Sequence, residues 1–109
     1  MEIPELVIDK EGKNLYHVYL FYIEEKWWAF GYSAYYLSIM YPILEATSQS
    51  ISEHEGSIPC VRVPDNFLAN LSDYYTTLVS DTYIQVDAPP TAYCYRKEYD
   101  GWRMSLTVN

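Results

Sequence analysis

The sequence predicts an α+β fold in a single domain, with a mixed β-sheet of about five to six strands and two main helices. Three observations support this prediction. The chain has 109 residues, close to the common size of one domain. Hydrophobic residues make up 50% of it, enough to bury a core without disulfides or a metal. Apolar segments of strand and helix type follow one another in the order β-β-α-β-α-β-β-β.

The first two strands are predicted on either side of a polar turn. Residues 1–14 are polar and lead into the first strand. Residues 15–23 (LYHVYLFYI) are apolar on both faces and rich in β-branched and aromatic residues, which is typical of a buried central strand. The polar residues 24–26 (EEK) then form a turn, and residues 27–32 (WWAFGY) return as the second strand.

A helix is predicted to follow this strand pair. Ser33 can cap a helix that begins at Ala34, because its hydroxyl can accept a hydrogen bond from the first turn. Pro42 should end or kink this helix, since proline lacks the amide donor and its ring clashes with the preceding turn. The polar, serine-rich residues 46–57 are expected to form a mobile loop within the domain.

The second half of the chain begins with a third strand at residues 58–63 (IPCVRV). Pro64 and Asp65 open the second helix, because proline suits its first turn and a carboxylate is favourable near its N-terminus. Apolar residues then recur at helical spacing as far as Leu78. Residues 83–86 (YIQV) form a fourth strand.

The chain is expected to end in a β-hairpin. Residues 93–97 and 102–106 would form its two strands, on either side of Asp100 and Gly101. The Asp-Gly pair is a strong signal for a tight hairpin turn. We therefore expect the last two strands of the sheet here.

The charge of the chain is strongly acidic. Fifteen Asp and Glu residues stand against seven Lys and Arg, for a formal net charge of −8. Such a field repels nucleic-acid phosphates and anionic lipids. It is compatible with a solvated acidic surface or with a basic partner.

Cys60 and Cys94 are the only cysteines, and neither belongs to a Cys-x-x-Cys or Cys/His ligand pattern. The N-terminal residues lack the basic and apolar regions of a signal peptide. We therefore expect reduced thiols and a cytoplasmic location. Both cysteines are interpreted as small buried hydrophobic residues.

Residues 27–44 carry no charge, which raises the question of a membrane span. Tyrosines, serines, Gly31 and Pro42 make this segment unfavourable in hydrocarbon, and no Lys/Arg cluster flanks it. We therefore expect no membrane partner.

No catalytic arrangement is apparent, and the sequence predicts a non-enzymatic protein without a metal or cofactor. His17 lies within a predicted buried strand, and His54 lies in a polar loop between two glutamates. Such histidines are more often structural or solvated than catalytic. The scattered glycines form no phosphate-binding loop.

Aromatic residues are the enriched resource of the chain. It contains 13 tyrosines and 3 tryptophans, but only 3 phenylalanines. Tyrosine combines a large ring with a polar hydroxyl, which suits interfaces and base stacking. A chain of this size cannot bury all of these rings, so we expect an exposed aromatic surface that binds a partner.

Two stretches together resemble the N-terminal mismatch-recognition domain of MutS DNA repair proteins. The first is residues 24–34 (EEKWWAFGYSA), which match the family pattern G-D-F-Y-E-L-F-G-E-D-A at Phe30, Gly31 and Ala34. The second is residues 57–71 (SIPCVRVPDNFLANL), which resemble I-P-M-x-G-V-P followed by a helix. The resemblance covers residues 15–86 in element order, through the strand at 83–86. It implies a MutS-like N-terminal fold in a stand-alone recognition module related to DNA repair.

The family reads mismatches with a Phe-x-Glu pair, and those two positions hold Lys26 and Trp28 here. The resemblance therefore does not carry that pair over. The chain is shorter than a complete repair protein and lacks its ATPase and clamp regions.

Two kinds of partner follow from these observations, and the sequence leaves the choice and the oligomeric state open. In one hypothesis an aromatic turn binds nucleic acid or another partner through Lys26, Trp27, Trp28 and Phe30. Possible phosphate contacts are then Arg96, Lys97 and Arg103. In the alternative, the chain is an acidic protein-binding module, of the inhibitor or immunity type, that covers a basic site on a partner protein.

Overall fold

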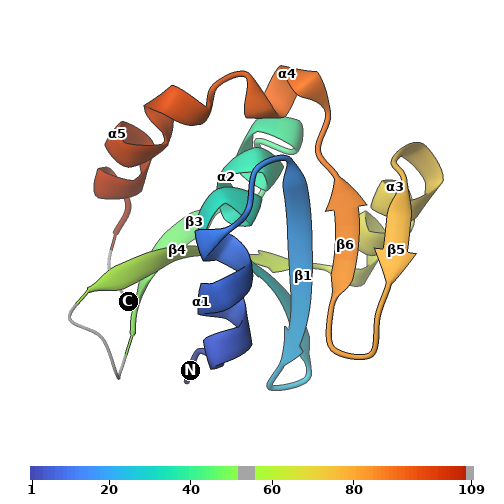
Figure 1. Cartoon of the computed structure of the whole chain (residues 1–109), viewed down its shortest axis with the longest axis horizontal. Coiled ribbons are helices and arrows are strands. Elements are labelled where there is room, and N and C mark those ends of the chain that lie inside the picture. The colour runs from blue at the N-terminus through green and yellow to red at the C-terminus, as the bar shows by residue number, and fades with distance from the viewer. Residues whose placement is uncertain (52–55, 108–109) are drawn as a thin grey trace.

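One antiparallel β-sheet organises the chain. The computed structural model describes residues 1–51 and 56–107. Its sheet has six strands in the order β3-β4-β2-β1-β6-β5 (Figure 1), and each pair of neighbours runs antiparallel. The strands are β1 (His17–Ile23), β2 (Lys26–Phe30), β3 (Ala46–Ser50), β4 (Ser57–Val63), β5 (Thr77–Val79) and β6 (Ile84–Asp87).

Helices cover both faces of this sheet. Two of them have ten residues and follow β2 and β4, as the sequence predicts: α2 (Gly31–Met40) and α3 (Asp65–Tyr74). The others are α1 (Glu5–Gly12), α4 (Pro90–Tyr93), the 3-10 turn η1 (Arg96–Glu98) and α5 (Tyr99–Met104). Helices α4 and α5 run across the top of the view in Figure 1, at the opposite end from the β1–β2 turn.

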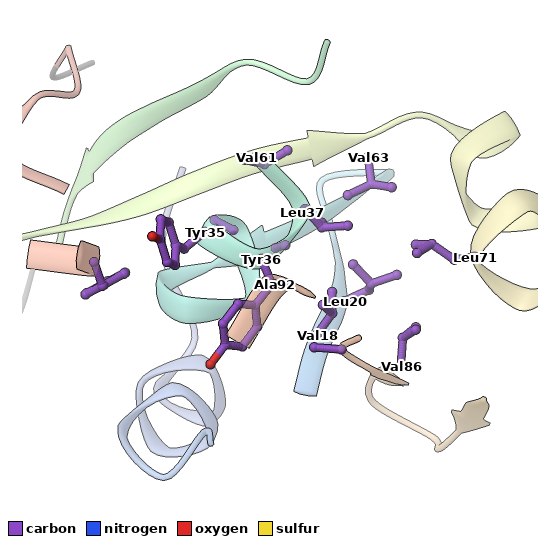
Figure 2. Packing of buried hydrophobic residues seen from close by; sticks show 14 residues of the cluster. Val18, Leu20, Tyr35, Tyr36, Leu37, Val61, Val63, Leu71, Val86 and Ala92 are labelled. Carbon is purple, nitrogen blue, oxygen red and sulfur yellow. The ribbon is translucent and has the colours of Figure 1, made fainter. Parts of the chain in front are cut away.

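The alternation of side chains along β1 creates two hydrophobic cores. Val18 and Leu20 point to the face covered by α2 and α3, whereas Phe21 points to the face covered by α1. The main core lies on the first face (Figure 2) and contains Val18, Leu20, Ala29, Ala34, Tyr35, Tyr36, Leu37, Val61, Val63, Leu71, Val86, Ala88, Ala92 and Tyr99. The second core contains Val7, Phe21, Phe30, Ile58 and Cys60.

The fold class and the number of strands are confirmed, but the mixed sheet is wrong. The two helical crossovers, β2–α2–β3 and β4–α3–β5, do connect strands that run in the same direction. Other strands lie between the members of each pair, because β4 separates β2 from β3 and three strands separate β4 from β5. Strands of the same direction are therefore never neighbours in the described sheet.

Helix α1 replaces the expected polar approach to the first strand. Val7 and Glu11 are its buried residues, and Val7 completes the second core. Most of its other side chains are polar or half exposed, so the segment lacks the broad apolar stripe that predicts a helix. Its contacts with β1 and α2 stabilise it instead.

Residues 46–57 do not form one continuous loop. Ala46–Ser50 pairs with β4 as strand β3, and Ser57 opens β4. The polar sequence ATSQS does not predict a strand. Strand β3 can nevertheless form because it lies at the sheet edge, where it buries mainly Ser48. The remaining residues 52–55, with His54, lie outside the described residues.

The predicted C-terminal hairpin is also wrong. Asp100 and Gly101 lie within α5, and the preceding residues form α4 and η1. Tertiary packing explains this outcome, since Tyr99 stacks on Tyr32 of α2 with ring centroids 4.0 Å apart, and Ala92 is fully buried. Pro90 at the start of α4 favours the helical conformation.

The structure shortens α3 relative to the prediction. Tyr75 caps α3 in an extended conformation, and Leu78 lies in strand β5 rather than in the helix. Across residues 1–51 and 56–107, every helix is too short or too polar to cross a bilayer.

Candidate functional site

The turn between β1 and β2 is tight and projects its charges into solvent. Glu24 and Glu25 have positive φ angles of 52° and 65°, which is the geometry of a two-residue type I′ hairpin turn. Ile23 therefore pairs directly with Lys26, and the Lys26 side chain is exposed.

The two tryptophans after this turn lie on opposite faces of the sheet. Trp27 packs against the main core, and its ring lies 5.2 Å from that of Tyr22. Trp28 packs against the second core, and its Nε1 donates a hydrogen bond to the carbonyl of Ile23 at 3.1 Å. Both rings are half-buried, and Phe30 is fully buried. The predicted aromatic turn is therefore not one continuous aromatic surface.

A polar pocket of about 230 Å³ lies beside Trp27. Its cations are Lys26 and Arg62, and its carboxylates are Glu25 and Asp65. The charges around the pocket are thus mixed, so the surface there is neither a basic nor an acidic patch.

The predicted phosphate contacts lie elsewhere, at the other end of β1. The guanidinium of Arg96 covers the Tyr32 ring at 3.8 Å. Its Nη1 donates hydrogen bonds to the carbonyls of Asn14 (3.0 Å) and Leu15 (2.9 Å) and to the hydroxyl of Tyr36 (2.7 Å). Arg96 therefore fastens the C-terminal segment to the start of β1.

The other two predicted phosphate contacts, Lys97 and Arg103, have different surroundings. Arg103 lies 3.7 Å from the carboxylate of Asp100 on the same helix. Lys97 is exposed. The structure thus brings none of the three predicted basic residues to the β1–β2 turn.

A buried polar network joins α1 to the start of α2. Glu11 accepts hydrogen bonds from the backbone amide of Ser33 (3.2 Å) and from its hydroxyl (2.5 Å). Asn14 donates to Glu11 and to the Ser33 hydroxyl, and Ser33 also accepts from the Tyr19 amide at 2.8 Å. Helix α2 begins at Gly31, and Ser33 lies inside it rather than capping it. Glu11 supplies the acceptor that a capping residue would otherwise provide.

Burial raises the pKa of the Glu11 carboxyl to about 7, while the hydrogen bonds from Ser33 and Asn14 oppose this shift. Glu11 as a whole is 7% exposed, so its carboxyl is largely shielded from solvent. We interpret the network as a structural connection between α1 and α2.

The two cysteines and His17 differ in their surroundings. Cys60 is buried, and burial raises the pKa of its thiol. Cys94 is exposed, which corrects the expectation that both cysteines are buried. Nε2 of His17, the first residue of β1, lies 3.5 Å from the carboxylate of Asp87 at the end of β6. Within residues 1–51 and 56–107, no three His, Cys, Asp or Glu side chains gather as metal ligands.

A surface that the sequence did not predict lies at the β5 edge of the sheet. Tyr74, Leu78 and Val79 are 75%, 59% and 72% exposed. An apolar groove of about 250 Å³ opens between α3 and this edge. It is lined by Leu20, Leu68, Ala69, Leu71, Ser72, Thr77, Val79, Ile84 and Val86.

Comparisons with protein-family models, with curated proteins and with solved structures find no match to this chain.

Charge distinguishes the surface at the β5 edge from the surface at the β1–β2 turn. Residues 63–95, which include α3, β5 and β6, contain four aspartates and no Lys, Arg or His. Asp73 and Asp81, on either side of β5, are both exposed. We call Asp73, Tyr74, Leu78, Val79 and Asp81 the edge surface. The absence of Lys, Arg and His from residues 63–95 can be read from the sequence. The exposure of Leu78 and Val79 cannot, because it depends on the position of β5 at the sheet edge.

Proposed function

We propose that the chain is a non-enzymatic, cytoplasmic, acidic protein-binding module that contacts a basic site on a partner protein through the edge surface. The observation that carries this proposal is the pairing of exposed apolar side chains with carboxylates in residues 63–95, which contain no Lys, Arg or His. Tyr74, Leu78 and Val79 supply apolar contact, and Asp73 and Asp81 supply charge.

The charges support a basic protein as the partner. A net charge of −8 accelerates the encounter with a cationic surface and opposes nucleic acid or another acidic protein. Lys10 is the one cation that a hydrogen bond among the described residues brings to the β5–β6 connection, where it donates to the Tyr83 hydroxyl at 3.1 Å.

The apolar side chains support a binding contact rather than a merely solvated surface. Tyrosine is enriched among the residues that dominate interface energies, and large apolar side chains that remain exposed together mark interaction sites. Val79 is 72% exposed and lines the apolar groove beside α3, so an apolar side chain and an apolar groove are available at the same place.

Affinity capture with the purified chain, followed by purification of the captured protein, tests this proposal. Val79→Glu should abolish capture, because Val79 lines the apolar groove and the substitution places a charge there. Ile43→Glu is the matched control, since Ile43 is 80% exposed in the connection between α2 and β3. Binding of the purified partner should weaken at high salt. A partner that binds wild type and Val79→Glu equally would contradict the proposal.

The resemblance to the MutS recognition domain keeps nucleic acid as a second candidate partner. The pocket beside Trp27 favours it, because Lys26 and Arg62 are exposed next to an aromatic ring. Fluorescence anisotropy with single-stranded, duplex and mismatched DNA at two salt concentrations tests this candidate. Salt-sensitive binding that Trp27→Ala weakens would support it, and absence of binding at micromolar protein would exclude it.

A further inference from the structure

The register of β5 determines which of its backbone groups face away from the sheet. The Thr76 carbonyl accepts a hydrogen bond from the Asp87 amide at 3.0 Å, and the Ser80 amide donates to the Tyr83 carbonyl at 2.9 Å. Hydrogen-bonding direction alternates along an antiparallel strand, so Leu78, paired with Gln85, also faces β6. The amides and carbonyls of Thr77 and Val79 therefore face outward.

The two edges of the sheet differ in what covers them. At the β3 edge, the Ser48 amide donates a hydrogen bond to the Thr107 carbonyl at 2.9 Å, so the C-terminal segment lies against that strand. Among the described residues, β5 pairs with β6 alone. Proteins protect an open edge with a very short strand, lysine or proline, among other devices. Strand β5 is short, but its three residues, Thr77, Leu78 and Val79, include neither lysine nor proline.

Unpaired strand amides and carbonyls are geometrically complementary to another extended strand. A strand added beside β5 would direct the side chains opposite Thr77 and Val79 toward the α3 face, where these two residues line the apolar groove. The side chain opposite Leu78 would point to the other face. The groove therefore suits two apolar side chains that are two residues apart.

The charges determine what should flank those side chains. Asp73 and Asp81 precede and follow β5, and both are exposed. Basic residues on either side of the apolar pair would meet these carboxylates. A second copy of this chain fits less well, because it would bring the same aspartates and another net charge of −8 to the contact.

We propose that β5 binds its partner by strand addition, accepting an extended segment with an apolar-x-apolar core and flanking basic residues. This inference rests on the proposed function, since it specifies how the edge surface recognises a basic protein. The recognition elements are the outward backbone groups of Thr77 and Val79, the groove beneath α3 and the two aspartates.

Amide hydrogen exchange measured by NMR provides the direct test. The probe is the synthetic peptide Lys-Lys-Val-Thr-Val-Lys-Lys with blocked ends. In the protein alone, the Thr77 and Val79 amides should exchange rapidly, whereas the Leu78 amide should be protected. Saturating peptide should slow exchange at Thr77 and Val79 at least about tenfold and leave Leu78 nearly unchanged.

Modified peptides and one protein variant separate backbone pairing from simple attraction. A peptide N-methylated at its two valines loses the amide donors that would face β5. It should therefore not protect the Thr77 or Val79 amide. A peptide with Glu in place of Lys should bind at least about tenfold more weakly. Val79→Pro removes an outward amide donor while leaving the β6-facing bonds in place, and it should weaken peptide binding more than Val79→Ala does.

The results that would contradict strand addition differ from those that would contradict the proposed function. Peptide binding that Val79→Glu abolishes, without protection of Thr77 and Val79 in the wild type, would overturn strand addition and leave the proposed function standing. If both the captured partner and the peptide bind Val79→Glu as well as wild type, the proposed function and this inference are both overturned. Protection of Thr77 and Val79 that appears without peptide and increases with protein concentration would identify a second copy as the occupant and overturn the proposed partner.

Discussion

The Glu11 carboxylate of α1 accepts a hydrogen bond from the Ser33 amide of α2 at 3.2 Å, although the two residues are far apart in the sequence. The carboxylate lies at the N-terminal turn of α2, where unpaired amides and the helix dipole favour negative charge. Burial opposes that charge more strongly, and the pKa of Glu11 rises to about 7.

This pKa predicts that stability depends on pH. The ordinary pKa of Glu is 4.5, so between about pH 4.5 and 7 the folded chain retains a proton that the unfolded chain has lost. The free energy of unfolding should therefore fall as pH rises through this window, by up to about 3 kcal/mol. Urea unfolding at pH 4.5, 5.5, 6.5 and 7.5 measures this change.

Glu11→Gln supplies the comparison, because the amide does not titrate. The stability difference between wild type and Glu11→Gln should change across the window, with wild type losing its relative advantage as pH rises. Asp9→Asn is the control, since Asp9 is an exposed carboxylate on the same helix. Parallel pH profiles for wild type and Glu11→Gln would show that Glu11 does not titrate in this range.

Gly31→Ala should destabilise the chain by about 2 kcal/mol. Gly31 has a φ of +56°, a conformation that L residues adopt with strain, and an added Cβ would lie 3.0 Å from Oε1 of Glu11. Gly101→Ala is the matched control, because a Cβ there meets open space within a helix. That variant should be stabilised by about 0.5 kcal/mol. Thermal unfolding of both variants measures the difference between their effects on stability. Equal effects of the two substitutions would contradict the prediction.

Arg96→Ala should reduce stability by about 2 kcal/mol, because it removes hydrogen bonds to two backbone carbonyls and to Tyr36. Lys97→Ala should change stability by less than about 0.5 kcal/mol, since Lys97 is exposed. Denaturant unfolding of the two variants measures the difference. If Arg96 were mainly a phosphate contact, Arg96→Ala would be as stable as wild type.

Phe30→Ala should cost about 3 to 5 kcal/mol, because it leaves a cavity in the second core. Lys26→Ala, at the exposed start of the same strand, should be nearly neutral. The unfolding midpoints of the two variants distinguish a core residue from an exposed residue within the predicted aromatic turn. A stable Phe30→Ala variant that loses partner binding would restore Phe30 as a contact residue.

Several elements could be predicted from the sequence because local signals and tertiary packing agree there. The apolar residues of β1, the polar turn before β2 and the Pro64–Asp65 start of α3 occur nearly where expected. Pro42 also lies just beyond the end of α2, as its missing amide requires. The charge pattern that defines the edge surface is likewise present in the sequence.

The candidate site was less predictable, because exposure depends on neighbours that are distant in sequence. Trp27 and Trp28 are adjacent in the chain, but strand geometry sends them to opposite cores. Arg96 is basic and close to Lys97, but its guanidinium reaches the carbonyl of Leu15. Composition alone did not distinguish such a structural arginine from a binding residue.

By itself, the sequence determined the α+β class, the central strand pair, the two longer helices and the acidic field, since these follow from periodicity, capping residues and charge. The tertiary structure alone decided the conformation of α1, β3, β5 and the C-terminal helices. These segments are short, polar or half exposed, so their local preferences are weak, and pairing or burial against distant residues selects their structure. The same pairing leaves one side of β5 open, which makes Thr77 and Val79 available to a partner.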